Sequence, residues 1–343
     1  MKKWLLMLSI LTFLAGCATG GNGPAPTTTN NNRVDSKNEK NIASHKEVYI
    51  GDFRVSFVTQ DKGSAKAGTP MLSRGSSGTE FAQSILVAKL TGIPKEIMQA
   101  ITDEVYADFK AGLQTKGYRI LDRSGLEQIS DWKGVDTISS PYDSAAGVSI
   151  TSLLKTAGGS SDQESITFAP TGMALVELSN ANLLPYKYGA SAAKSGKPIL
   201  RAHYTVHFAY FGNETDYRID YAAVDRAGDS KRTLSANTSM GQGIQVLPGA
   251  AIEFALDGGG TFTKSGYVAL KDPVVVGGAY GENIDTTSGT TKAVNAFSSA
   301  LGALSGGSTS KKEISVRANP EYYRQGALKA LDESNVRLIR ALP

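Results

Sequence analysis

The only cysteine of the chain, Cys17, is the residue with the most evident chemistry. It follows Lys2, Lys3 and an apolar run from Trp4 to Leu14, and the small residues at positions 15 and 16 directly precede it. The run is too short to cross a bilayer, which takes roughly 20 apolar residues, and is typical of a secretory signal. At that place a thiol is the only side chain nucleophilic enough to accept a diacylglycerol chain.

Residues Leu14, Ala15, Gly16 and Cys17 match the lipobox of bacterial lipoproteins. The match predicts a signal peptide over residues 1–16, cleavage before Cys17, and a membrane anchor made of a covalent diacylglycerol and an N-acyl chain such as palmitate. Several chains give stable anchoring, whereas one binds only marginally. Ala18 stands where enterobacterial lipoproteins of the inner membrane carry Asp, so the resemblance favours the outer membrane, with the domain in the periplasm. An ordinary secretory signal with an incidental cysteine is the alternative.

Other chemistry is sparse in the sequence. A lipidated Cys17 leaves the mature chain without disulfides, thiolate metal sites or a thiol nucleophile. The sequence contains no His-Glu-x-x-His, no phosphate loop and no Gly-x-Ser-x-Gly motif. We therefore predict that the protein is not an enzyme and carries no metal and no cofactor beyond the acyl chains.

Two histidines lie four residues apart in a predicted strand, His203 and His207. They share one face but are separated by roughly 13 Å along a strand, which is too far for joint chelation of one zinc ion. A helix would bring them together, but the surrounding β-branched and aromatic residues favour a strand. We expect both to pack on the sheet or face solvent, and His45 to be incidental.

Acidic and aromatic residues offer two further possibilities. Asp52, Asp122 and Asp225 end or interrupt predicted strands, so we expect turn and cap residues, with a carboxylate pair for acid–base chemistry as the alternative. Several tyrosines alternate along strands, which is typical of a half-buried sheet with polar rims. They also form a possible partner surface: Tyr204, Tyr210, Tyr217 and Tyr221.

The elements that must position these residues begin after a polar segment. Residues 17–46 are rich in Gly, Pro, Thr and Asn and predict a lipidated, disordered tether. Residues 47–343 predict one α+β domain, with a possible subdivision near 131–165. The net charge of +4 is too mild to indicate nucleic acid.

The fold class that we predict is a β-α-β-α unit followed by an antiparallel β-meander and a C-terminal helix. The unit comprises a strand over 48–58 with a bulge at Gly51–Asp52, a loop over 61–79, a strand or short helix over 81–90, a helix over 94–116, a strand over 118–122 and a helix over 124–130 capped by Ser124. A strand over 171–178 and a loop over 180–198 come next. The meander comprises strands over 200–211, 217–224, 232–240, 244–256 and 261–276, with turns at Gly212–Asn213 and 227–229. A helix over 293–304, a strand over 314–316 and a helix over 320–341 end the chain.

The first unit resembles the lipoprotein family of the curli secretion channel and the N-terminal domain of TolB-like periplasmic proteins. The resemblance rests on residues 48–53, the helix ending at Gly117, and 118–129, in which Asp122–Glu127 fits the family's entry into a second helix. Residues 217–239 are similar to the family's hairpin. Channel members form a ring-shaped pore from two amphipathic hairpins per subunit. Residues 244–276 could supply one, and a second is not evident, so the resemblance supports an outer-membrane lipoprotein with this module better than a pore.

These observations predict a membrane-anchored structural or assembly component of a secretion or surface-appendage system, which would assemble as an oligomeric ring. Its partners would be the membrane, through the lipid, and other copies or other envelope proteins, with no nucleic acid. The alternative is a monomeric periplasmic binding module for a peptide or glycan that uses the tyrosine-bearing sheet. A hydrolase is a third hypothesis and requires a compact Asp/His/Ser cluster.

Overall fold

A computed structural model describes residues 33–68, 81–144, 163–177, 184–224, 230–256, 265–293, 295–296 and 307–343. The predicted signal peptide, the lipobox residues Leu14, Ala15 and Gly16, and Cys17 lie outside these residues. So do Asp225, the predicted turn at 227–229 and most of the predicted helix over 293–304. Lipidation of Cys17 therefore stays a prediction.

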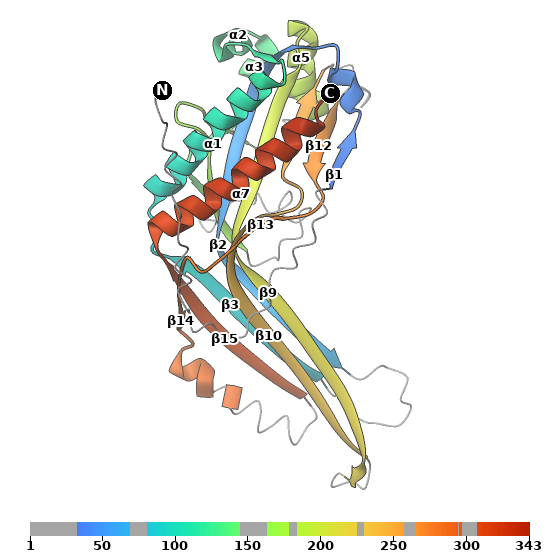
Figure 1. Ribbon diagram of the computed structural model, residues 1–343, viewed down its shortest axis with the longest axis vertical. Coiled ribbons are helices and arrows are strands. Elements are labelled where there is room, and N and C mark those ends of the chain that lie inside the picture. The colour runs from blue at the N-terminus through green and yellow to red at the C-terminus, as the bar shows by residue number, and fades with distance from the viewer. Residues whose placement is uncertain are drawn as a thin grey trace, which may run out of the picture.

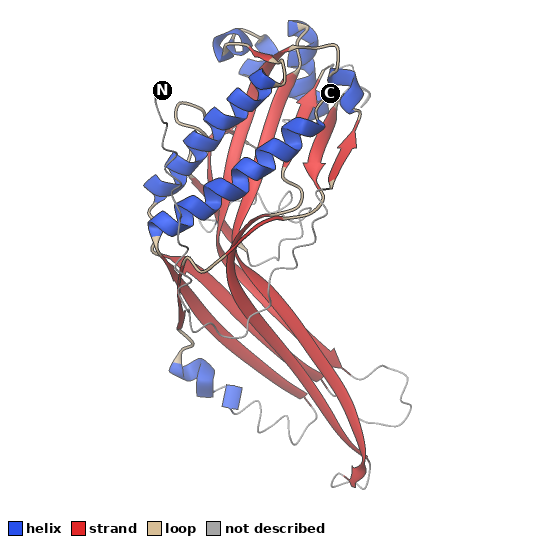
Figure 2. Cartoon of the chain, in the orientation of Figure 1, coloured by secondary structure: helices blue, strands red, loops and turns tan. Residues whose placement is uncertain are grey.

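One mixed sheet of 13 strands forms the frame of the molecule (Figures 1 and 2). Its strands are β1 (Val34–Lys37), β2 (Glu47–Gly68), β3 (Phe81–Thr91), β4 (Arg119–Ile120), β6 (Tyr142–Asp143), β7 (Glu164–Phe168), β9 (Ile199–Val224), β10 (Ser230–Val246), β11 (Ala251–Ala255), β12 (Gly266–Leu270), β13 (Val274–Gly277), β14 (Gly281–Asp285) and β15 (Gly307–Ala318). The main order is β1-β12-β11-β9-β2-β3-β15-β14, and β10 lies beside β9 and β13. A separate two-stranded sheet pairs β5 (Thr137–Ile138) with β8 (Leu175–Val176).

The predicted fold class is wrong, because the first unit and the later strands are not successive structures. Strand β2 pairs in parallel with β9, and β3 pairs in parallel with β15. The two halves of the chain therefore share one sheet, and β4, the predicted return strand of the β-α-β-α unit, is only two residues long. Alternation of apolar and polar residues along a strand indicates which face each side chain occupies, but not which strand lies beside it. Local sequence patterns therefore could not predict this long-range pairing.

The predicted meander is instead dominated by one long hairpin of β9 and β10. Gly212 and Asn213, expected to turn the chain, lie within β9 opposite Ser239 and Thr238. The predicted return strand over 217–224 is the continuation of β9 and pairs with the first part of β10. Turn-type residues occur here inside a strand because the continuous ladder with β10 outweighs their local preference.

Strand β2 is longer than its apolar part. The predicted bulge is confirmed, since the register against β9 shifts between Ile50 and Asp52. A Cβ atom at Gly51 would lie 2.6 Å from Trp132 and 2.7 Å from Ile199, so only glycine fits there. The strand continues to Gly68, so the predicted loop is wrong for residues 61–68, while residues 69–80 lie outside the described chain.

Two long helices lie side by side on one face of the sheet (Figure 1): α1 (Lys95–Thr115) and α7 (Pro320–Ala341). Both confirm the predicted helices. Helix α1 ends before Gly117, whose φ is +92°, and the Asn319 side chain caps α7 by accepting from two backbone N–H groups. Their apolar stripes cover aromatic residues of the sheet, and the ring of Phe53 lies 5.3 Å from Phe109 and 5.6 Å from Tyr204.

Short helices cover the other face of the sheet near its upper end: α2 (Arg123–Glu127), α3 (Ser130–Lys133), the π-helical turn η4 (Leu184–Tyr188) and α5 (Gly189–Ser195). With β5 and β8 they form what we call the cap, around a second apolar cluster that includes Leu126, Trp132, Val176 and Tyr188. The predicted loop over 180–198 is thus largely helical where it is described. Asp122, not Ser124, is the N-cap of α2, because its carboxylate accepts from the Ser124 N–H at 2.7 Å.

The folded chain begins earlier than predicted. Strand β1 pairs with β12, and the Arg33 guanidinium donates to the Asp272 carboxylate at 3.0 and 2.8 Å. The 3-10 helix η1 (Glu39–Ile42) follows and buries Ile42. A disordered tether is therefore wrong for residues 33–46. The polar composition is explained by the position of β1, a short edge strand whose side chains are mostly exposed.

Candidate assembly surface

The large sheet divides into two layers below the helices. The parallel pairing of β2 with β9 ends at Phe57 and Val206. Beyond that point β2 pairs with β3, from Gln60 opposite Lys89 onward, and β9 pairs with β10. Figure 1 shows these strands running away from the helices. We call residues 60–68, 81–91, 208–224, 230–242 and 307–318 the arm, and the rest of the described chain the body.

The two layers of the arm meet through small residues. Gly63 is packed so closely that an added Cβ would lie 2.5 Å from the Phe211 ring and 2.7 Å from the Thr238 methyl group. The Thr238 N–H donates to Ser84 Oγ at 3.2 Å, and Thr238 Oγ1 donates to the Ser84 carbonyl at 3.2 Å. Some other buried residues of the arm are also small, among them Ala65, Ala67 and Ala82, whereas Leu86, Met240 and Val316 are larger. This interface therefore combines close backbone approach at Gly63 with a mixture of small and larger apolar side chains.

Four strands of the arm have residues with a strand partner on one side only, within the described residues. Residues 61–68 of β2 and 307–313 of β15 pair only with β3, while residues 208–224 of β9 and 230–242 of β10 pair only with each other. The β10 edge contacts β3 at Thr238, whose N–H donates to Ser84 Oγ. An open edge presents unpaired backbone N–H and C=O groups and is a template for another strand. Lys62 and Lys66 lie on the β2 edge, and lysine on an edge limits indiscriminate pairing.

The predicted histidine pair is divided between separate sites. His207 is buried where arm and body meet; its Nδ1 accepts from the Ala209 N–H at 3.0 Å, so its Nε2 donates to Asp61 at 2.8 Å. The His203 ring contacts the Gly249 carbonyl at 2.9 Å, and burial lowers the pKa of His203. Both pack on the sheet, as predicted. No cluster of three or more metal-ligating side chains occurs among the described residues.

The tyrosines do not form the predicted partner surface as a group. Tyr204 is buried, and its hydroxyl donates to Asn335 Oδ1 at 2.6 Å, so it belongs to the core beneath α7. Tyr210 is half-buried with an unpaired hydroxyl, and burial raises its pKa to about 12. Tyr217 and Tyr221 lie on β9 within the arm, but their side chains are outside the described residues.

The described aspartates have separate partners as well. Asp52 is fully buried and binds Arg54 at 2.5 Å. Asp122 caps α2, and hydrogen bonds from Ser124 lower the pKa of Asp122. The prediction that Asp122 is a helix-capping residue is confirmed. Asp52 instead lies within a strand, in a charged cluster that the sequence analysis did not predict. The available signal was a charged residue at two alternate positions of an apolar strand.

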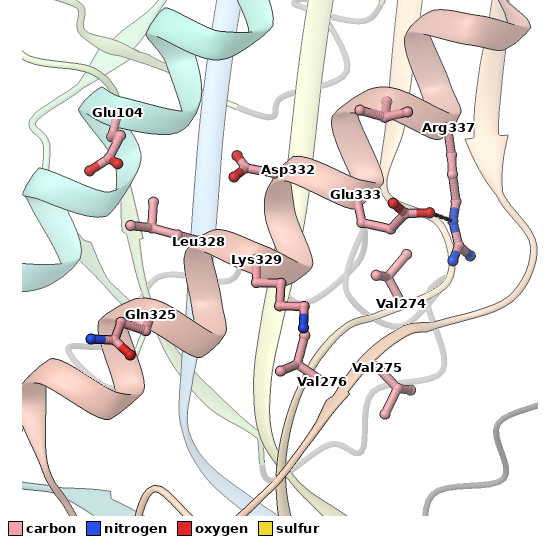
Figure 3. A pocket seen from close by; sticks show the side chains of 11 residues that line it. Glu104, Val274, Val275, Val276, Gln325, Leu328, Lys329, Asp332, Glu333 and Arg337 are labelled. Atoms are coloured by element: carbon pink, nitrogen blue, oxygen red, sulfur yellow. Dashed lines mark hydrogen bonds and ion pairs between the residues drawn. The ribbon is translucent and has the colours of Figure 1, made fainter. Parts of the chain in front are cut away.

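A groove with a volume of about 680 Å³ lies along the outer side of α7. Figure 3 shows that Val274, Val275 and Val276 of β13 line it together with Leu328 and other side chains of α7. Asp332 lies on the side nearer Glu104 of α1 (Figure 3). Partial burial, with Asp108 and Glu104 nearby, raises the pKa of Asp332 to about 6. The groove depends on β13 lying beside α7, a long-range contact that no local pattern predicts.

Comparisons of the chain with protein-family models, curated proteins and solved structures find no match. The resemblance to the curli secretion channel family therefore stays a prediction. Among the described helices, none combines the length and the apolar character that crossing a membrane requires.

Proposed function

We propose that the protein is a structural component of the bacterial envelope, anchored through Cys17, whose copies associate through the arm. The open strand edges of the arm are the observation that supports this proposal most directly. The lipobox supports a location at the outer membrane. The family resemblance supports a role in a secretion or surface-appendage system.

The arm has physical reasons to take up a partner. A two-stranded hairpin is marginally stable in water on its own, and several buried side chains of the layer that packs on it are small, namely Ala65, Ala67, Ala82 and Ser84. Pairing between an open edge of one copy and a different edge of the next would satisfy backbone groups and bury more surface. Such a head-to-tail contact closes into a ring when the rotation between copies permits.

Cryo-electron microscopy of the full-length, lipidated protein extracted in mild detergent tests the proposal. We expect ring-like oligomers in which arms of neighbouring copies touch. A monodisperse monomer at high protein concentration would contradict the proposal.

Engineered disulfides locate the contact, because Cys17 is the only natural cysteine and its thiol is consumed by the lipid. Ser64 and Asn213 are exposed on the β2 and β9 edges. We expect Ser64→Cys combined with Asn213→Cys to give covalent dimers and higher species after mild oxidation. The matched control replaces Ser64→Cys by Glu321→Cys, at an exposed position of α7 in the body, and should stay monomeric under denaturing conditions.

A monomeric binding module is the second candidate, and the groove along α7 is the observation that favours it. Its volume lies within the roughly 300–1,000 Å³ typical of ligand pockets. This function predicts saturable binding of a peptide or glycan by a monomer, and loss of binding in Leu328→Asp with the arm unchanged.

A further inference from the structure

A cluster of charged side chains lies between the sheet and the cap. Asp52 and Arg54 of β2 and Arg201 of β9 point away from α1 and α7, since neighbouring Phe53 and Ala202 occupy the opposite face. Asp52 lies opposite Arg201 in the register of the two strands. Arg201 also binds Glu253 of β11, with Nε at 2.6 Å and Nη2 at 2.5 Å from one carboxylate oxygen.

The cluster is deeply buried for its charge. Asp52 is 0% exposed, and Arg54 and Arg201 are 5% exposed each. Charges in such a place are costly unless they are paired and fully hydrogen-bonded. The pairing is present, but the hydrogen bonding is incomplete.

Five polar atoms here have no hydrogen-bond partner among the described residues: Asp52 Oδ1, Arg54 Nη1, Arg201 Nη1, Tyr188 Oη and Ser191 Oγ. The described chain contains two further such atoms, on Tyr210 and Tyr323. The cap brings Tyr188 to the charges, because its ring lies 6.0 Å from the Arg201 guanidinium carbon. Ser191 is fully buried in the cap, three residues or about one helical turn after Tyr188.

The unpaired atoms define what would satisfy them. Two are guanidinium donors and two are hydroxyls that can donate, while Asp52 Oδ1 can only accept. Arg54 and Arg201 balance Asp52 and Glu253, while Arg123 donates to the Gly51 carbonyl at 3.0 Å and pairs with Glu127 at 3.5 Å. Because two of the unpaired donors belong to guanidinium groups, the best occupant is a negatively charged one that accepts several hydrogen bonds and donates at least one.

We propose that this cluster is a binding site for a small protonated oxyanion of the hydrogen carbonate or hydrogen phosphate type, enclosed between the sheet and the cap. The oxygens accept from the two arginines and the two hydroxyls, and the hydroxyl of the anion donates to Asp52. Charge-assisted hydrogen bonds of this kind are the strong ones. The site is separate from the arm, so this proposal does not depend on the proposed function.

Thermal unfolding of the full-length protein in detergent tests the site, with sodium phosphate, sodium hydrogen carbonate and sodium chloride compared at one pH and ionic strength. We expect a saturable rise in Tm with one of the two oxyanions, since a ligand that binds only the folded state stabilises it. Whichever oxyanion gives the rise identifies the ligand class. Equal Tm values in all three salts would overturn the proposal.

Variants separate the site from a general salt effect. Tyr188→Phe and Ser191→Ala remove hydroxyls that have no protein partner, so the fold should persist. We expect each to weaken anion binding by about tenfold, the effect of one lost hydrogen bond to a charged group. The matched control is Tyr210→Phe, which removes an unpaired hydroxyl from a distant place and should bind normally. Unchanged binding in Tyr188→Phe and Ser191→Ala, or only water in the site of a crystal grown in the stabilising anion, would overturn the proposal.

Discussion

The body and the arm are built from the same two strands, β2 and β9, yet they differ in what holds them together. In the body, Phe53 and Tyr204 are buried beneath α1 and α7. In the arm, the same strands carry Gly63 on β2 and exposed Asn213 on β9. Each of the two strands thus continues from an aromatic core into a thin two-layer structure.

The difference is one of side-chain size rather than secondary structure. A buried aromatic side chain removes roughly 150–250 Å² from water, at roughly 25 cal/mol per Å², whereas an alanine removes far less. The body therefore has a large hydrophobic driving force of its own. The arm has a smaller one, and its open edges leave it suited to stabilisation by a neighbour.

The largest expected effect comes from the aromatic core of the body. Phe53→Ala should lower the free energy of unfolding by about 3–5 kcal/mol, because it leaves a cavity among Tyr106, Phe109 and Tyr204. Ala67→Gly in the arm should cost about 1 kcal/mol or less. Urea unfolding followed by circular dichroism measures both. Similar costs for the two variants would mean that arm and body are equally well packed.

A bulky residue at Gly63 should damage the arm selectively. Gly63→Val forces the two layers apart and should cost about 1–3 kcal/mol, with faster hydrogen exchange over 60–68 and 81–91 and unchanged protection in α1. The neighbouring exposed position supplies the control, Ser64→Val, which should leave exchange near normal. Faster exchange throughout the body would show that the two regions unfold as one unit.

Two tyrosines of β9 give a closer comparison. Tyr204→Phe removes the donor to Asn335 Oδ1 and leaves a buried acceptor unpaired, which should cost about 1–3 kcal/mol. Tyr210→Phe removes a hydroxyl that has no partner among the described residues and should be neutral or slightly stabilising. Thermal melting of the two variants checks the order, and the reverse order would contradict the assigned hydrogen bond.

The smallest effect concerns pH and the two helices. The pKa of Asp332 is raised to about 6 in the folded state from an ordinary 3.8, so the folded state binds more protons between these values. Stability from this group therefore falls as pH rises from about 4 to above 6. Asp332→Asn should raise Tm at pH 7.5 and leave Tm unchanged at pH 4. At pH 7.5 the gain in the free energy of unfolding should be less than about 1 kcal/mol, because solvent screens the carboxylate.

A control for that titration is available on the same helix. Glu333 forms an i,i+4 pair with Arg337 at 2.8 Å, so Glu333→Gln should change Tm little, and without the same dependence on pH. A rise in Tm for Asp332→Asn that is equal at both pH values would argue against the raised pKa.

Local features of the fold were predictable because they depend on neighbours in sequence. The stripe of α1, its end at Gly117, the proline at the start of α7 and the bulge at Gly51 all rest on residues a few positions apart. Non-local pairing was not predictable: the parallel contacts of β2 with β9 and of β3 with β15 join segments more than a hundred residues apart. That pairing, and not the helices, decides the fold class.

For the candidate sites as well, local features were predictable from the sequence and features that depend on strand pairing were not. Sequence could nominate His203 and His207 as sheet residues, since their spacing on a strand separates them. It could not show that Tyr204 lies under α7, or that Arg54 and Arg201 lie on adjacent strands, because both facts depend on which strands pair. The open edges of the arm are likewise a property of strands that lack partners, and no local pattern encodes them.

The pairing of β1 with β12 also sets a length scale. The described structure includes Arg33, so with a lipid on Cys17 about 15 residues at most join the membrane to the body, a reach of no more than roughly 55 Å. Copies held in such a thin layer have a high effective concentration, and contacts between them are helped as in multivalent binding. Edge contacts too weak to detect in dilute solution would then suffice at the membrane surface, and a chain lacking the lipid should need far higher concentrations to associate.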